Sequence, residues 1–211
     1  MNNLFDQIKS AEVLTNAWQT VRKKNAKGGI DGINPPDLDT TISKTIRKLS
    51  SRLAEGKYVP APYEQIKIPK FNDANEWRPL SLPVVEDKVV QQAAVNVMTP
   101  VFEKEFLDCS YAYRQKKGAA KAIRRVEHII ETQKINWIVS HDIDNFFDTM
   151  NHDLLIKKIS RAVNDPSLLS LIRLWLKSGL IGPRGDFKDS DAGIAQGAVI
   201  SPLLSNIYLN S

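Results

Sequence analysis

The chain has 211 residues, 42% of them hydrophobic and 25% charged, with a formal net charge of +5. That length suits one or two modules with a sizeable buried core, and the single cysteine, Cys109, excludes an internal disulfide framework and a thiolate metal cluster. No apolar run reaches the roughly 18 residues of a membrane span, and Met1 to Asp6 lacks a secretory pattern, so we expect a cytosolic protein that does not enter a membrane.

The first part of the chain is expected to be mostly helical, and it carries the excess of basic residues. Leu14, Trp18 and Val21 recur at helical spacing. The segment 34–37, Asn-Pro-Pro-Asp, has the residue types of a helix start. The helix expected after it has its apolar positions at Leu38, Ile42, Ile46, Leu49 and Leu53.

The rest of the chain is expected to mix short strands with amphipathic helices. Strands are predicted at 63–69 and 136–143, and a hairpin or loop is predicted around the glycines between 179 and 186. Helices are predicted at 85–98, 119–130, 152–159 and 166–176. A last helix opens at Ser201-Pro202, in an arrangement of a cap followed by proline.

The strand predicted at 136–143 delivers a carboxylate near its end. Alternation places Ile138, Ser140 and Asp142 on one face and Trp137 on the other. A carboxylate at a strand edge suits a hard divalent cation such as Mg²⁺, which takes one or two carboxylates together with substrate phosphates. The other interpretation is that Asp142 only caps a turn, a common role for aspartate.

Five blocks of sequence, taken together and in order, follow one family pattern, and chance matches would not also preserve their spacing. They are Gly29-Ile30-Asp31-Gly32-Ile33; Ile68-Pro69-Lys70 with Trp77-Arg78-Pro79-Leu80-Ser81-Leu82-Pro83 and Asp87-Lys88-Val89-Val90-Gln91; Ser110-Tyr111-Ala112-Tyr113-Arg114; the segment around Asp142; and Ala195-Gln196-Gly197 with Ser201-Pro202-Leu203-Leu204-Ser205-Asn206. Over nearly its whole length the chain resembles a prokaryotic reverse transcriptase of the group II intron-encoded (maturase) type.

The resemblance implies an α+β fold, with the fingers and a partial palm of a right-hand polymerase and an antiparallel sheet packed on helices. It divides the chain into an N-terminal helical extension with the start of the fingers at 1–60, fingers at 61–130 and a partial palm at 131–211. Such a palm would leave a strand edge and apolar surface uncovered, so self-association is also expected.

The implied activity is that of an RNA-directed DNA polymerase, which adds dNTPs to a DNA or RNA primer on an RNA template. The family uses two Mg²⁺ ions, with Mn²⁺ as an alternative, held by Asp142, the carbonyl of Ile143 and an aspartate pair in a Tyr-X-Asp-Asp hairpin. Residues 1–211 lack that hairpin, since only Leu209, Asn210 and Ser211 follow Tyr208. We therefore expect the fragment alone not to extend a primer.

The resemblance also implies a nucleotide-binding set. Lys70 and Arg78 would neutralise the triphosphate, Phe147 would be the steric gate that excludes a 2′-hydroxyl, and Gln196 with Gly197 would contact the incoming nucleotide and its base pair. The alternatives are that the two cations are exposed loop charges and that the Phe147 ring is part of the core, although Phe146 suits the core better. His141 and His152 have no partners at ligand spacing and are assigned to structure.

A basic run without acidic residues fits a groove that follows nucleic-acid phosphates. Its members are Arg114, Lys116, Lys117, Lys121, Arg124 and Arg125. The alternative interpretation is a solvated helix face. The resemblance also implies a second class of function, a non-catalytic module that binds intron RNA, because intron proteins of the family use the basic fingers and N-terminal surface on the intron itself. An intron maturase, a CRISPR-linked enzyme, a diversity-generating element and a phage-defence enzyme all stay open as the parent protein.

Overall fold

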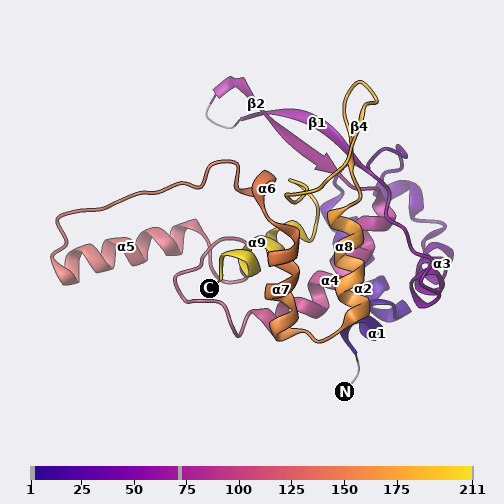
Figure 1. The fold of residues 1–211 in the computed structure, drawn as a ribbon, viewed down its shortest axis with the longest axis horizontal. Helices are drawn as coiled ribbons and strands as arrows, with labels where there is room; N and C mark the ends of the chain where they lie inside the picture. The colour runs from indigo at the N-terminus through magenta and orange to yellow at the C-terminus, as the bar shows by residue number, and fades with distance from the viewer. Residues whose placement is uncertain (1–2, 71–72, 211) are drawn as a thin grey trace.

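The structure is a computed structural model that describes residues 3–70 and 73–210. Helices form most of the body, and the strands lie together at one end of it (Figure 1). In chain order the elements are α1 Leu4–Ile8, α2 Ala11–Lys24, the 3₁₀ helix η1 Pro35–Leu38, α3 Ile42–Ala54, β1 Tyr63–Lys70, β2 Asp73–Leu82, α4 Val85–Phe102, α5 Ala119–Gln133, α6 Phe146–Thr149, α7 His152–Ala162, α8 Pro166–Leu176, β3 Leu180–Ile181, β4 Phe187–Lys188 and α9 Ser201–Leu209.

Helix α4 forms the centre of the core. It is buried around much of its circumference, from Val85 to Phe102, and α1, α2, α3 and α9 all contact it. Side chains from α7 and α8, such as Leu155 and Ile172, complete the same cluster with no exposed surface. The amphipathic pattern predicted for α2 is confirmed, because Leu14, Trp18 and Val21 all face this core.

Two pairs of antiparallel strands meet in one mixed sheet with the order β2-β1-β3-β4. The β1/β2 hairpin and the short β3/β4 hairpin are antiparallel, whereas β1 and β3 pair in parallel at Tyr63↔Leu180 and Glu64↔Ile181. The predicted α+β class is confirmed, while the sheet is mixed and not purely antiparallel. The parallel pairing joins residues more than a hundred positions apart, which local patterns do not reveal.

Helix starts agree with the sequence where a side chain caps the first turn. Asn151 accepts a hydrogen bond from the Leu154 N–H at the start of α7, and Asp165 accepts one from the Leu168 N–H at the start of α8. Asn34 behaves differently from the prediction: it caps only the short η1, and α3 starts separately at Ile42. Proline and the aspartate at N3 close a single 3₁₀ turn there, so the chain breaks before the longer helix.

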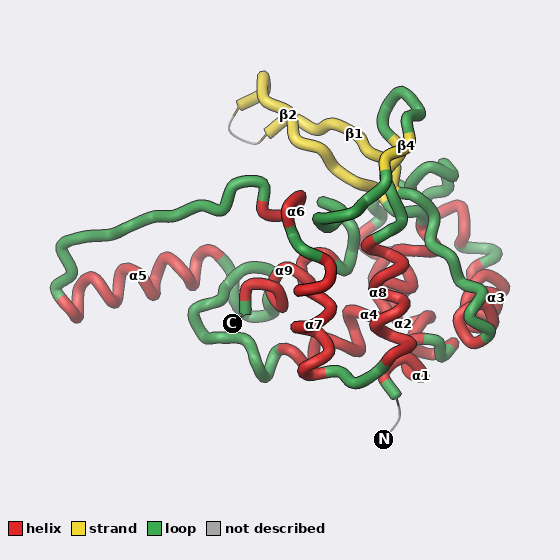
Figure 2. The backbone as a smooth tube through the Cα atoms, viewed as in Figure 1, coloured by secondary structure: helices red, strands yellow, loops and turns green. Residues whose placement is uncertain are grey.

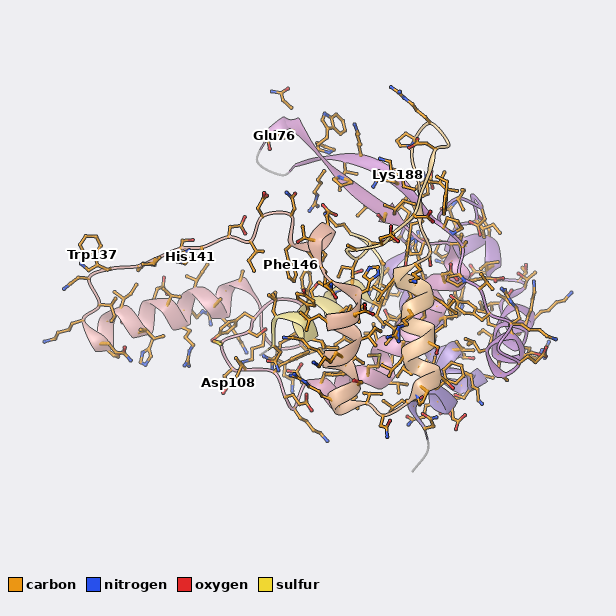
Figure 3. All side chains as sticks on the ribbon, viewed as in Figure 1. Glu76, Asp108, Trp137, His141, Phe146 and Lys188 are labelled. Atoms are coloured by element: carbon orange, nitrogen blue, oxygen red, sulfur yellow. The ribbon has the colours of Figure 1, made fainter. Side chains whose placement is uncertain are left out.

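Helix α5 projects from the body, and the chain returns beside it as an extended coil over residues 135–143 (Figure 2). The prediction of a strand at 136–143 is therefore wrong. A strand needs a neighbour to bond its backbone N–H and C=O groups, and no other strand pairs with this segment within residues 3–70 and 73–210. Trp137, labelled in Figure 3, is 87% exposed as a result.

Two further predictions concern Ser201 and the membrane. Ser201 is the first residue of α9 and not its cap; its hydroxyl donates to the Ala195 carbonyl oxygen over 2.7 Å. Among the described residues, no helix combines the length and apolar character needed to cross a bilayer. The division into segments 1–60, 61–130 and 131–211 stays a prediction.

Candidate functional site

The loop that contains Gln196 and Gly197 lies against the β1/β2 hairpin. The Ser81 N–H donates to the Gln196 carbonyl oxygen over 2.6 Å. Gly197 has φ +110°, and a Cβ at this position would lie 2.8 Å from the Ser81 carbonyl oxygen. Because an L side chain suits neither that conformation nor that gap, the position requires glycine. The close backbone approach holds Gln196 beside β2.

The same loop is bonded to α6, the short helix that follows the Asp142 segment. The Ile194 N–H donates to the Phe147 carbonyl oxygen over 2.7 Å. The Gln196 side-chain amide donates to Asp148 Oδ1 over 3.3 Å. One loop is thus bonded both to α6 and to the β1/β2 hairpin.

An open hollow of about 730 Å³ lies between the hairpin, α6 and this loop. Arg78, Asp142, Ile143, Phe147 and Gln196 all line it. The structure thus brings together five predicted site residues that come from three separate parts of the chain. Arg78 and Asp142 are exposed on its walls, and Phe147 is half-buried.

The other two predicted nucleotide-binding residues lie at the margins of the described site. Gly197 lines a neighbouring hollow of about 440 Å³, which shares Arg78, Phe147 and Gln196 with the first. Lys70 ends β1, and its side chain lies outside the described residues.

The rings of Phe146 and Phe147 have different surroundings. Phe146 contacts Phe147 edge to face at 5.5 Å between ring centroids, and it contacts Tyr208 of α9 at 6.0 Å. Phe147 faces both hollows, whereas Phe146 lines only the larger one. Both rings are partly buried against the core, so the assignment of Phe146 to the core and of Phe147 to a ligand stays a prediction.

The carboxylates of the larger hollow are Asp142 and Asp148. Together with the Ile143 carbonyl they offer oxygen donors, the type that Mg²⁺ prefers. Both carboxylates come from one short segment and therefore approach from one side. Among the described residues, no group of three or more His, Cys, Asp or Glu side chains is placed to hold a metal ion. The oxygen donors of this segment therefore fit Mg²⁺ and would supply part of its coordination shell.

Residues 68–211 match the family described as Reverse transcriptase (RNA-dependent DNA polymerase). The chain belongs to this family. The matched range contains β2, the Asp142 segment and the Gln196 loop, which are the parts that build the hollow.

Similar curated proteins include several encoded by introns. The chain is 36% identical to "Protein YkfC" of Escherichia coli (strain K12) over 86% of its own length and 48% of that protein. It is 30% identical to "Group II intron-encoded protein LtrA" of Lactococcus lactis subsp. cremoris, over 88% of the chain and 30% of that protein. It is also 30% identical to "Putative COX1/OXI3 intron 1 protein" of Saccharomyces cerevisiae, over 99% of the chain and 24% of that protein. The chain is thus a member of the reverse transcriptase family of the group II intron-encoded type, and it spans about half or less of the length of these relatives.

A solved structure supports the same fold. The chain superposes on a chain of "Partial Cas6-RT-Cas1--Cas2 complex" with a TM-score of 0.64 and 22% identity. The match covers 99% of this chain and 34% of that chain. The described part of the chain therefore adopts the reverse transcriptase fold.

One residue of the predicted nucleic-acid-binding set has an internal role instead. The Arg114 side chain is only 5% exposed, and its Nε and Nη2 donate to Glu103 Oε1 over 2.9 and 2.6 Å. Its Nη1 donates to the carbonyl oxygens of Leu107 and Ser110. The guanidinium thus fixes the loop after α4 and is not presented to a phosphate, because its donors are used inside the protein.

The remaining basic residues are placed differently. Lys117 donates to the Asp108 carbonyl oxygen over 2.9 Å and is partly occupied in the same loop. Lys116, Lys121, Arg124 and Arg125 are exposed, on the loop and on α5. These four stay predicted nucleic-acid contacts.

The smaller hollow contains basic residues that the sequence did not single out. Lys24 of α2 and Lys88 of α4 line it together with Arg78, and no carboxylate is among its described lining residues. The Lys88 ammonium donates to the Ala26 and Lys27 carbonyl oxygens. Burial lowers the pKa of Lys88, and Asp31 opposes that shift. A lysine in the apolar stretch of α4 was the available signal.

Asp87 in the first turn of α4 is buried, with 3% of its surface exposed. The Tyr58 hydroxyl donates to Asp87 Oδ1 over 2.6 Å, and the Ala61 N–H donates to Oδ2 over 2.9 Å. Tyr58 itself accepts from Trp175 Nε1 over 3.2 Å. Burial raises the pKa of Asp87 to about 6, although the hydrogen bonds from Tyr58 and Ala61 act in the opposite direction.

Gln91 links this buried region to the site loop. Its side-chain oxygen accepts from the Val199 N–H over 2.9 Å, and its amide nitrogen donates to the Tyr63 hydroxyl over 3.0 Å. Burial raises the pKa of Tyr63, which stays a neutral hydroxyl. Sequence analysis missed the role of Gln91, and the signal was again a polar residue in a buried helix.

Proposed function

We propose that the chain forms the fingers and part of the palm of an RNA-directed DNA polymerase that acts in a group II intron-type retroelement. The observation that carries the proposal is the shared hollow of Arg78, Asp142, Phe147 and Gln196. A cation, a carboxylate, an aromatic ring and an amide face one space large enough for a nucleotide. The polymerase would join a dNTP to a DNA or RNA primer opposite an RNA template.

Each side chain has a role that follows from its chemistry. Arg78 would bind the triphosphate, since its planar fork matches phosphate oxygens. The Phe147 ring would lie under the sugar and exclude a 2′-hydroxyl. Gln196 would contact the nucleotide and its base pair, in a loop held by Gly197 and Gln91. Lys70 would add a second cation to the triphosphate site.

Divalent metal use is general in the family, and Mg²⁺, or Mn²⁺ as an alternative, is the cofactor we propose. Asp142 and the Ile143 carbonyl would hold it. Two such ions, when bound, would activate the primer hydroxyl and stabilise the leaving oxygens. The residues of this chain would position the nucleotide and hold its phosphates next to the metal ions.

Primer extension by residues 1–211 alone is expected to be undetectable. A two-metal site needs ligands on both sides of the ions, and the described carboxylates of the hollow, Asp142 and Asp148, come from one segment. The measurement is extension of labelled DNA and RNA primers on an RNA template with Mg²⁺ and dNTPs. Extension that Asp142→Ala abolishes would contradict the expectation.

Nucleotide binding tests the proposal without requiring turnover. Arg78→Ala is expected to weaken the affinity of 1–211 for Mg²⁺-dATP by about 10- to 100-fold, because a charge-assisted hydrogen bond to phosphate is lost. Isothermal titration measures the affinity. Arg184→Ala is the matched control, since Arg184 is an exposed arginine of the β3/β4 turn outside the hollow and its loss should have little effect. Equal binding by the Arg78 variant and the parent chain would refute the proposed role.

The second candidate function is a non-catalytic module that binds intron RNA. It is favoured by the exposed cations Lys116, Lys121, Arg124 and Arg125 in a run that contains no acidic residue. RNA affinity together with undetectable dATP affinity would support this module over the polymerase.

Self-association also stays a proposal, supported by the exposed apolar side chains of the 135–143 coil.

A further inference from the structure

Tyr113 combines an unusual backbone with a bare aromatic ring. It has φ +57°, in the left-handed region that bulky L residues rarely adopt, and it is 69% exposed. Among the described residues, no other ring stacks on it and no cation lies over it. An exposed tyrosine held in a costly conformation needs a structural or functional reason.

The residues on both sides of Tyr113 are anchored, one to α9 and the other to the loop that follows α4. The Ala112 carbonyl oxygen accepts from Asn206 Nδ2 of α9 over 2.9 Å. Arg114 is fixed by Glu103 and by the carbonyl oxygens of the preceding loop. These anchors impose the backbone at Tyr113 and hold its ring outward. The ring is thus preorganised, which lowers the entropic cost of binding.

The ring lies where two hollows meet. Tyr113 lines both the hollow of about 440 Å³ and another of about 400 Å³. The first carries Lys24, Arg78 and Lys88 and no carboxylate among its described lining residues. The second carries Lys116, while its other cation, Arg114, is paired with the Glu103 carboxylate that also lines it, so Lys116 supplies the unpaired positive charge among its described lining residues. An aromatic face between cationic hollows is how proteins hold single-stranded nucleic acid: the base stacks, and the flanking phosphates meet the cations.

We propose that Tyr113 is a stacking platform for one unpaired base of single-stranded RNA, with Lys116 and Lys24 near the phosphates on either side. The inference rests on the proposed nucleic-acid function and adds the residue that would tell a single strand from a duplex. A paired base has its faces covered by its neighbours in the stack, so a duplex would offer Tyr113 only its ends.

The test is fluorescence anisotropy of 1–211 with an unstructured RNA of about 12 nucleotides. Tyr113→Leu and Tyr113→Ala are expected to lower the affinity about 5- to 100-fold, while Tyr113→Trp and Tyr113→Phe keep it, because stacking needs a ring and not the hydroxyl. Tyr111→Ala is the matched control: its ring belongs to the same loop but lies against the Lys117 ammonium, 5.0 Å from the centroid.

Salt dependence separates stacking from charge. Tyr113→Leu should leave the slope of log affinity against log salt unchanged, whereas Lys116→Ala should reduce it by about one. RNA binding that is equal in Tyr113→Leu and the parent chain, or an equal loss on duplex RNA, would overturn the inference alone. No RNA binding by the parent chain, even at low salt, would overturn the inference and the proposed nucleic-acid function together. Tyr113→Trp shows by its retained binding that the loop still folds.

Discussion

Asp87→Asn is expected to gain stability relative to the parent chain as the pH rises from about 4 to about 7. Burial raises the pKa of Asp87 to about 6 in the folded protein, so the native state holds its proton more tightly than the unfolded chain. The stability from Asp87 is fully present below the unfolded pKa and is lost as the pH rises through the folded value. The unfolded and folded pKa values of Asp87 lie about two pH units apart, so the stability difference between the variant and the parent chain should change by about 3 kcal/mol over this range.

The measurement is urea unfolding of both proteins at several pH values, compared as a difference so that the other titrating groups cancel. Tyr58→Phe provides a second comparison. It removes the hydroxyl that donates to Asp87 over 2.6 Å. Because that bond favours the ionised carboxylate, its loss should raise the pKa of Asp87 further, and the pH range over which stability is lost should move to higher pH. Parallel stability curves for Asp87→Asn and the parent chain from pH 4 to 7 would show that Asp87 does not titrate in this way.

Gly197→Ala is expected to lower the free energy of unfolding by about 2–4 kcal/mol and to abolish measurable dATP binding. The new Cβ would lie 2.8 Å from the Ser81 carbonyl oxygen at φ +110°. This steric overlap can be removed only if the loop moves away from β2, and that movement breaks the 2.6 Å hydrogen bond from the Ser81 N–H to the Gln196 carbonyl oxygen. Gln196 would then leave the wall of the hollow.

Gly32→Ala is the control that separates the backbone effect from the close approach. Gly32 also has positive φ, +70°, but no atom lies within 4 Å of an added Cβ. It should cost only about 1 kcal/mol and leave dATP binding intact. Chemical denaturation and calorimetric titration of the two variants give the comparison. If the two alanines cost the same, contact between the loop and β2 does not determine the site.

The local patterns predicted most helices because their signals lie within one or two turns. Helix α8 spans Pro166–Leu176 as expected, since Asp165 and Pro166 mark its start and its apolar residues keep one period. The same locality explains the errors. Asn34 has the signals of a helix start, yet it caps only η1. Residues 136–143 have the alternation of a strand, but alternation does not supply a partner.

The candidate site was predicted from ordered motifs and not from geometry. The sequence contained Arg78, Asp142, Phe147 and Gln196 at family spacing, and the structure places all four on one hollow. Arg114 shows the limit of this reasoning. Its charge suggests a phosphate contact, but carbonyl oxygens and Glu103 use its donors.

The sequence by itself determined that this chain belongs to the reverse transcriptase family and resembles its group II intron-encoded type, because motif order and spacing are properties of the chain alone. Helix periodicity, which is equally local, predicted most of the helices. Only the tertiary structure decided which polar groups are buried, which face a ligand and which hold a loop. Asp87, Gln91 and Tyr113 receive their roles from partners distant in sequence, such as Tyr58, Val199 and Asn206. The free energy of a polar side chain depends on those partners and on its exposure to water, and neither is fixed until the chain has folded.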